Sequence, residues 1–174
     1  MKQIIITLAI VFVFYCCGKH NNKNEYNYET FRMDAALSVL NENQIAKTYF
    51  FKYDTVDYYL EYEYTFLGEI KNAKEGNLKF LFCTTFFGIY EDSQKASSTI
   101  LIFKKNKLYG LYCFYIEYPT PVINGSDLIF SIGEPECNFT TAINFKYCIP
   151  QEIFIKCMIE SGTIFGEIFS FEKW

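Results

Sequence analysis

Two glutamates at alternate positions, Glu61 and Glu63, are the residues whose type and spacing could do acid–base chemistry. Side chains two residues apart lie on the same face of a strand, where a general acid and a general base could both reach one substrate. Solvated strand faces often carry the same pattern. The single histidine, His20, stands before the segments that we expect to fold. Histidine-dependent triads and dyads are therefore excluded from the folded part, and we expect no enzyme activity.

Seven cysteines offer thiol chemistry. Cys83 and Cys113 lie in apolar segments, where cysteine acts as a small hydrophobe, so we expect buried thiols there. Cys137 stands in a predicted loop and Cys157 near the end of a predicted strand, which makes them the preferred disulfide pair, with Cys148 as the competing partner. Because the chain has no CxxC spacing and no histidine near these cysteines, we expect no metal site and no cofactor.

Residues 1–16 have the pattern of an export signal. Lys2 supplies the positive start, residues 4–15 are apolar, and small residues follow. The apolar run is shorter than the roughly 20 residues that a membrane-spanning helix needs, so a cleaved signal is the better interpretation. Export would bring the chain into a compartment where disulfide bonds persist.

The end of this signal resembles the lipobox of bacterial lipoproteins. Phe14 stands three residues before Cys17, with Cys16 just before it and Gly18 just after it. The resemblance implies thioether lipidation of Cys17, cleavage between Cys16 and Cys17, and acylation of the new N-terminus. Phe14 is bulkier than the leucine usual at its place, and the doubled cysteine offers Cys16 as a second acceptor. The alternative is an ordinary export signal with incidental cysteines.

Lipidation at Cys17 would determine where the protein resides. Two or more acyl chains hold a protein stably on a membrane, so the resemblance implies a lipid-anchored protein of a Gram-negative cell envelope. Gly18 in place of Asp after the acceptor implies the outer membrane, facing the periplasm. Residues 17–28 are predicted to be a polar tether because they carry little apolar surface. Residues 29–174 are long enough for a single domain.

The pattern of apolar residues predicts one helix followed by strands. Over residues 29–46 apolar side chains recur at three- and four-residue steps, which predicts an amphipathic helix with a stop near Asn41 and Asn43. Apolar and polar residues alternate over 60–66, which is typical of a strand. Residues 78–87 are apolar on both parities and predict a central strand that is covered on both faces.

The rest of the chain predicts further strands joined by short turns. Lys104 to Lys107 separates apolar runs at 100–103 and 108–117, and Asn106 tolerates the left-handed conformation that tight hairpins require. Other strands are predicted at 127–132, 152–158 and 164–171. Six or seven strands with hairpin-length joins and one N-terminal helix predict an α+β fold. It would be built mainly on an antiparallel sheet, and a strongly curved sheet is one option.

Phe, Tyr and Trp make up 20% of the chain. Most of these rings are expected to fill a β core. The functional alternative is a face that stacks sugars or grips a peptide, lined by Tyr58, Tyr59, Tyr62, Tyr64, Tyr109 and Tyr115. Thr55, within Asp54-Thr55-Val56, resembles the O-glycosylation acceptor of some Gram-negative envelope proteins.

The charge balance restricts the classes of partner. The chain carries 16 Lys and Arg against 20 Asp and Glu, and the sequence shows no basic cluster, so nucleic acid is not expected as a partner. The first functional hypothesis is a non-catalytic binding or structural module for an envelope protein or glycan. The second is an immunity-type lipoprotein that neutralises a periplasm-targeted toxin, which small acidic lipidated domains can resemble. The third is an enzyme that uses carboxylates alone.

Overall fold

The computed structural model describes residues 26–53, 58–90, 93–134, 137–158 and 164–174, and of residues 26, 27, 133, 134, 137, 138, 158 and 164 it describes the backbone but not the side chain. In these ranges the chain forms one helix and ten strands. They are α2 (Tyr26–Glu42), β1 (Thr48–Lys52), β2 (Tyr59–Asn72), β3 (Gly76–Gly88), β4 (Lys95–Lys104), β5 (Lys107–Phe114), β6 (Val122–Asn124), β7 (Asp127–Glu134), β8 (Cys137–Asn144), β9 (Glu152–Met158) and β10 (Ile164–Lys173).

The strands form two sheets in which neighbouring strands pair antiparallel. The larger sheet has seven strands in the order β1-β2-β3-β4-β5-β10-β9, and the smaller has three in the order β6-β7-β8. The amide N–H of Lys156 in β9 donates to Thr141 Oγ1 in β8 at 3.0 Å and so links the two sheets. The predicted class, an α+β fold dominated by antiparallel sheet with one helix, is confirmed.

The residue type at position 43 explains where helix α2 ends. Asn43 has a φ of 53°, and its N–H donates to the carbonyl of Val39 at 3.2 Å, so the helix stops where an asparagine tolerates the left-handed conformation. The predicted stop is confirmed, but the predicted extension to Ala46 is wrong. The helix also begins at Tyr26 and not at Glu29. Residues 26–28, which were predicted to belong to the polar tether, therefore belong to the helix.

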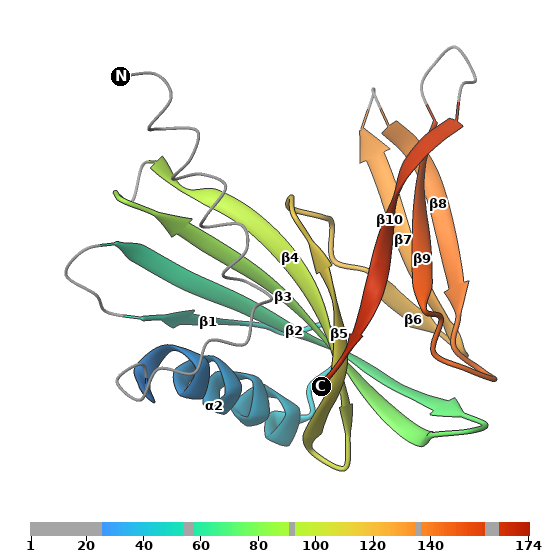
Figure 1. Cartoon of the computed structure of the whole chain (residues 1–174), viewed down its shortest axis with the longest axis horizontal. Coiled ribbons are helices and arrows are strands. Elements are labelled where there is room, and N and C mark those ends of the chain that lie inside the picture. The colour runs from blue at the N-terminus through green and yellow to red at the C-terminus, as the bar shows by residue number, and fades with distance from the viewer. Residues whose placement is uncertain (1–25, 54–57, 91–92, 135–136, 159–163) are drawn as a thin grey trace.

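Two apolar cores lie on the two faces of the large sheet. One is packed between the sheet and α2, and the other between strands β2–β5 of the sheet and strands β6–β10 (Figure 1). β3 contributes to both: Phe80 and Phe82 belong to the second core, and Leu81 and Cys83 to the first. The prediction that this strand is covered on both faces is confirmed. Ala35 and Leu40 of α2 are buried in the first core, as the helical pattern predicted.

Turns and bulges shape the large sheet. Lys105 and Asn106 have φ values of 51° and 59°, so the β4–β5 hairpin has the pair of left-handed residues that its predicted turn requires. The β2–β3 register shifts at Gly68, whose φ of 123° is one that residues with a side chain rarely adopt. Bulges of this kind bend a strand and increase its twist, and the long strands of the sheet twist visibly in Figure 1.

Candidate functional site

The predicted six-tyrosine face does not exist as one surface. Tyr62 and Tyr64 are completely buried beneath α2, where their rings stack with centroids 5.9 Å apart. The hydroxyl of Tyr64 donates to the carbonyl of Arg32 in the helix at 3.1 Å. Burial is the main cause that raises the pKa of both phenols above their ordinary value, so both stay neutral. This part of the prediction is wrong: the two tyrosines belong to the core.

The other four predicted tyrosines divide between the two ends of the large sheet. Tyr58, Tyr59 and Tyr115 lie at one end, where Tyr59 pairs with Gly88 across β2 and β3. Tyr109 lies at the opposite end, in β5, next to the β4–β5 turn. Tyr58 and Tyr115 are exposed, and Tyr59 and Tyr109 are half-buried. The two ends therefore have to be considered as separate candidate sites.

The first end, which we call the acidic pole, carries carboxylates beside exposed apolar side chains. Its members are Glu61, Glu63 and Glu117 with Phe50, Tyr58, Ile89, Tyr90, Tyr115 and Ile116, each of the last six at least 40% exposed. Strand pairing brings them together, because Phe50 pairs with Glu63 across β1 and β2. Ser98 in β4 also donates its N–H to the carbonyl of Ile116 at 3.1 Å.

Electrostatic repulsion is part of the acidic pole. Partial burial, and next the charges of Glu61 and Glu117, raise the pKa of Glu63 above its ordinary value. The hydroxyl of Tyr59 donates a hydrogen bond to Glu61. A cationic group at this end would relieve the repulsion between the carboxylates. Acid–base chemistry by Glu61 and Glu63 stays a prediction.

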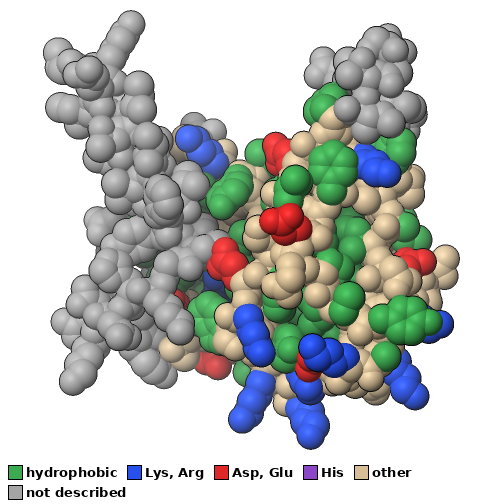
Figure 2. Space-filling model, turned by 45° about the vertical axis from the view of Figure 1, so that its right-hand side comes forward, with side chains coloured by type: hydrophobic (Ala, Val, Ile, Leu, Met, Phe, Trp, Pro, Cys, Tyr) green, Lys and Arg blue, Asp and Glu red, His purple; other side chains and the backbone are tan. Residues whose placement is uncertain are grey.

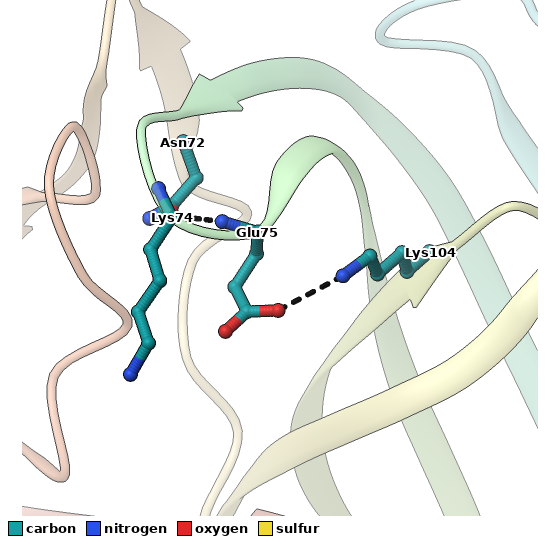
Figure 3. A network of polar contacts seen from close by, with 4 residues as sticks. All are labelled: Asn72, Lys74, Glu75 and Lys104. Carbon is teal, nitrogen blue, oxygen red and sulfur yellow. Dashed lines mark hydrogen bonds and ion pairs between the residues drawn. The ribbon is translucent and has the colours of Figure 1, made fainter.

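The second end, which we call the lysine pole, is organised around the buried side chain of Asn72 (Figure 3). Its Oδ1 accepts hydrogen bonds from the N–H groups of Lys74 and Glu75 at 2.9 and 2.8 Å, which closes the β2–β3 turn. Its Nδ2 donates to the carbonyl of Phe145 at 2.7 Å, and so joins this turn to the segment between β8 and β9. One side chain therefore fixes two segments that are far apart in the sequence.

An ion pair joins a third segment to the lysine pole. Lys104 Nζ lies 2.9 Å from Glu75 Oε2, which connects the β4–β5 hairpin to the β2–β3 turn (Figure 3). The hydrogen bond from Lys104 lowers the pKa of Glu75. The end of β10 is a fourth segment, since Lys173 pairs with Gly110 and its Nζ lies 5.4 Å from the centroid of the Tyr109 ring. The Lys104 Nζ lies 5.6 Å from the same ring.

These four segments place seven lysines at one end of the molecule. They are Lys71, Lys74, Lys104, Lys105, Lys107, Lys146 and Lys173, and all but the half-buried Lys104 are exposed. In Figure 2 the basic side chains gather along the lower edge, where Figure 1 shows the β2–β3 and β4–β5 turns. No basic cluster is apparent in the sequence because each segment contributes one to three lysines. The fold assembles the cluster.

Arg32 is not among the candidate site residues predicted from the sequence. It is the one arginine of the chain, and it lies partly buried in α2. The charge interactions of its guanidinium involve Tyr64, Cys83 and Tyr28, which all lie at the interface between helix and sheet. A guanidinium stays charged at any ordinary pH, so Arg32 brings a fixed positive charge to the edge of an aromatic core.

The cysteines follow the sequence predictions in part. Cys83 is a buried thiol, Cys113 a half-buried thiol and Cys148 an exposed thiol. Cys157 is in a disulfide bond. The side chain of Cys137 lies outside the described residues, so the predicted Cys137–Cys157 pair stays a prediction, but the thiol state of Cys148 removes the competing partner. The predicted lipidation site Cys17 and glycosylation site Thr55 also lie outside the described residues.

No three His, Cys, Asp or Glu side chains among the described residues are grouped so that they could hold a metal ion. In the same part of the chain, no helix is both long enough and apolar enough to cross a membrane. Comparison of the chain with protein-family models, curated proteins and solved structures gave no match.

Proposed function

We propose that the protein is a lipid-anchored, non-catalytic binding module of the cell envelope. The anchor would be Cys17, at the outer membrane and facing the periplasm, and the lipobox resemblance at Phe14 to Cys17 supports it. The tether leads into the acidic pole, because α2 begins there: the ring of Tyr28 lies 6.1 Å from that of Tyr62 and 6.4 Å from that of Tyr53, measured between centroids. The domain would therefore be attached to the membrane by the end that carries the carboxylates.

The acidic pole is the proposed contact surface for a protein partner. The observation that carries this proposal is the concentration of six exposed large apolar side chains beside three carboxylates at one end of the sheet. Exposed apolar patches of this kind mark interaction sites, and aromatic residues are enriched in protein interfaces. The carboxylates would favour a partner with a basic surface, through complementary charge. A glycan that stacks on the exposed tyrosines is the other partner in this proposal.

Site-specific cross-linking in cells tests the contact surface. A photo-reactive phenylalanine analogue would replace Tyr90, which is 69% exposed at the acidic pole, or Tyr147, which is 67% exposed near the lysine pole. We expect one discrete protein adduct from position 90 and none of the same mass from position 147. The adduct should disappear when Tyr115→Ser and Ile116→Ser are added. Identical adduct patterns from both positions would reject the acidic pole as the contact surface.

The anchor has a matched pair of variants because the two cysteines are adjacent. Cys17→Ser removes the proposed acceptor, whereas Cys16→Ser keeps a small residue before the cleavage site. We expect the first variant to lack acyl chains in mass spectrometry of its N-terminal peptide. The second should behave as the unchanged protein does. An unacylated N-terminal peptide in the unchanged protein, or an acylated one in Cys17→Ser, would contradict the anchor.

An immunity-type lipoprotein is the second candidate. The repulsion among the carboxylates of the acidic pole favours it, because a cationic toxin would relieve that repulsion on binding. Cells that lack the protein would then be killed by a toxin-producing neighbour, and the protein would restore their survival. The double variant Glu61→Lys and Glu63→Lys would fail to restore it. If this variant protects as well as the unchanged protein does, the toxin does not bind at the acidic pole.

A further inference from the structure

The lysine pole is a preformed surface and not a chance grouping of mobile side chains. Its turns are fixed by the buried Asn72, by the Lys104–Glu75 ion pair, and by a bond from the N–H of Ala73 to the carbonyl of Lys146 at 2.7 Å. Six exposed ammonium groups therefore project from a rigid backbone. A ligand that bridges several of them would lose little binding free energy to the ordering of the protein.

Positive charge is in excess at this pole. Seven lysines stand against Glu75, Asp127, Glu152 and Glu172, the acidic residues of the same turns and strand ends. Glu75 is already paired with Lys104, and Asp127 accepts a hydrogen bond from the amide of Asn144. Apart from the Lys104–Glu75 pair, six lysines stand against three carboxylates. The surface fits an anion with many charges better than it fits a single carboxylate.

The composition of the pole favours a polymer over a folded protein. Lysine is depleted in the cores of protein interfaces, which need apolar side chains that can be fully desolvated. Here the exposed rings are Tyr147, whose centroid lies 5.1 Å from Lys146 Nζ, and Trp174, which follows Lys173 in the chain. Rings of this kind stack on the apolar faces of sugars while the lysines contact charged groups. The surface has the two chemistries that an acidic sugar chain needs.

The direction of the chain argues against the anchoring bilayer as the ligand. β2 runs 14 residues from the acidic pole to the lysine pole, which corresponds to about 45 Å. Residues 17–25 reach at most about 30 Å when fully extended. With the tether at the acidic pole, a domain that stands on that pole holds the lysine pole away from the membrane. This step rests on the proposed function, whereas the charge of the pole does not.

We propose that the lysine pole binds an anionic polysaccharide, one whose sugars carry carboxylate, sulfate or phosphate groups. Lysines from separate turns contact successive charges along the chain, and Tyr147 and Trp174 stack on its sugars. The acidic pole stays available for the protein partner, so the two ends would serve different ligands at the same time.

Two triple variants with the same change in net charge provide the test. Lys74→Gln, Lys105→Gln and Lys107→Gln remove exposed lysines of the pole without touching Asn72 or Lys104. Lys52→Gln, Lys95→Gln and Lys156→Gln remove three exposed lysines elsewhere. The full-length lipidated protein in a neutral detergent would be titrated with dextran sulfate, with uncharged dextran as the control polymer. Thermal unfolding of both variants checks that they are folded.

We expect the unchanged protein to bind dextran sulfate but not dextran. The pole variant should lose at least about tenfold in affinity, and the control variant less than about threefold. Binding by the unchanged protein should weaken as salt rises from 50 to 200 mM. Equal losses in the two variants, or no loss in the pole variant, would overturn the proposal. Tighter binding to single-stranded DNA would also overturn it, in favour of that ligand.

This experiment can fail separately from the proposed function. It uses no envelope partner, and its pole variant leaves the acidic pole unchanged, whereas the cross-link at position 90 leaves the lysine pole unchanged. Loss of polysaccharide binding with a normal cross-link at position 90 would reject this inference alone.

Discussion

The lysine pole and the acidic pole differ in how their backbone is held as much as in their charge. At the lysine pole, Asn72 makes three hydrogen bonds from a buried position. At the acidic pole, the corresponding buried polar residue is Ser98, whose Oγ accepts one hydrogen bond from the N–H of Tyr118 at 3.0 Å. The buried Asn72 side chain of the lysine pole thus makes three hydrogen bonds, and the buried Ser98 side chain of the acidic pole makes one.

This difference suggests a division of roles. A rigid array of point charges suits a ligand with repeated charges, because nothing has to be ordered on binding. An end with exposed tyrosines and isoleucines beside its carboxylates offers apolar contact surface, which suits a protein partner. The following variants would sharpen or remove the distinction.

The largest effect is expected from Asn72→Ala. It leaves the carbonyl of Phe145 and the N–H groups of Lys74 and Glu75 without their partner, so the free energy of unfolding should fall by about 3 kcal/mol. Urea denaturation followed by circular dichroism measures it. Asn77→Ala, an exposed position of the same hairpin, is the control and should change stability by less than about 0.5 kcal/mol. Equal effects of the two variants would mean that the hydrogen bonds of Asn72 do not stabilise the lysine pole.

A smaller effect is expected from Ser98→Ala. It removes one hydrogen bond and leaves the buried N–H of Tyr118 unpaired, so the free energy of unfolding should fall by about 1 to 1.5 kcal/mol. The same denaturation experiment measures it, with the exposed Ser131→Ala as control. A loss as large as that of Asn72→Ala would remove the distinction between the two ends.

Glu63→Gln and Glu75→Gln should change stability with opposite signs. The folded-state pKa of Glu63 is raised, so its ionised form is destabilising at neutral pH, and its replacement should raise the free energy of unfolding at pH 7. The folded-state pKa of Glu75 is lowered, so its ionised form is stabilising. Its replacement should therefore lower the free energy of unfolding at pH 7.

The pH dependence of these two variants separates the causes. The gain from Glu63→Gln should vanish as pH falls below the ordinary carboxyl pKa, where Glu63 is protonated in both states. The loss from Glu75→Gln should vanish only once pH falls through the lowered folded-state pKa. Both effects should be smaller than that of Ser98→Ala. Denaturation at several pH values measures them, and two changes of the same sign would contradict the electrostatic difference.

The smallest effects on stability are expected from Tyr90→Ser and Tyr147→Ser. Both rings are exposed, so each change should alter the free energy of unfolding by less than about 0.5 kcal/mol. Their effects on binding should differ: the first should weaken retention of the protein partner, and the second should weaken binding of dextran sulfate. Pull-down and titration measure them. If either change affects both ligands, the two ends do not act independently.

Local patterns were sufficient to predict the elements whose pattern is strong. The helix stop at Asn43, the hairpin turn at Lys105 and Asn106, and the covered strand β3 all follow from residue types that leave few alternatives. β1, β6 and β8 were not predicted. β6 has three residues, which is too few for a pattern, and β1 lies at the sheet edge with alternately exposed residues. Pairing with their neighbours, and not local sequence, makes them strands.

The burial of Tyr62 and Tyr64 follows from the sequence pattern. Tyr62 and Tyr64 alternate with Glu61 and Glu63, and the same alternation that predicted the strand places the tyrosines on its apolar face. The lysine pole could not be predicted in this way. It needs the β2–β3 and β4–β5 turns and the β8–β9 segment to meet, and only the three-dimensional pairing of strands determines that.

The position of β10 between β5 and β9 has a consequence for how the chain reaches its native state. The large sheet cannot be completed until β10 has paired with β5, because β9 joins the sheet only through its pairing with β10. Pairings over such long sequence separations form slowly. Until β10 pairs, the edge of β5 opposite β4 has no strand partner among the described residues.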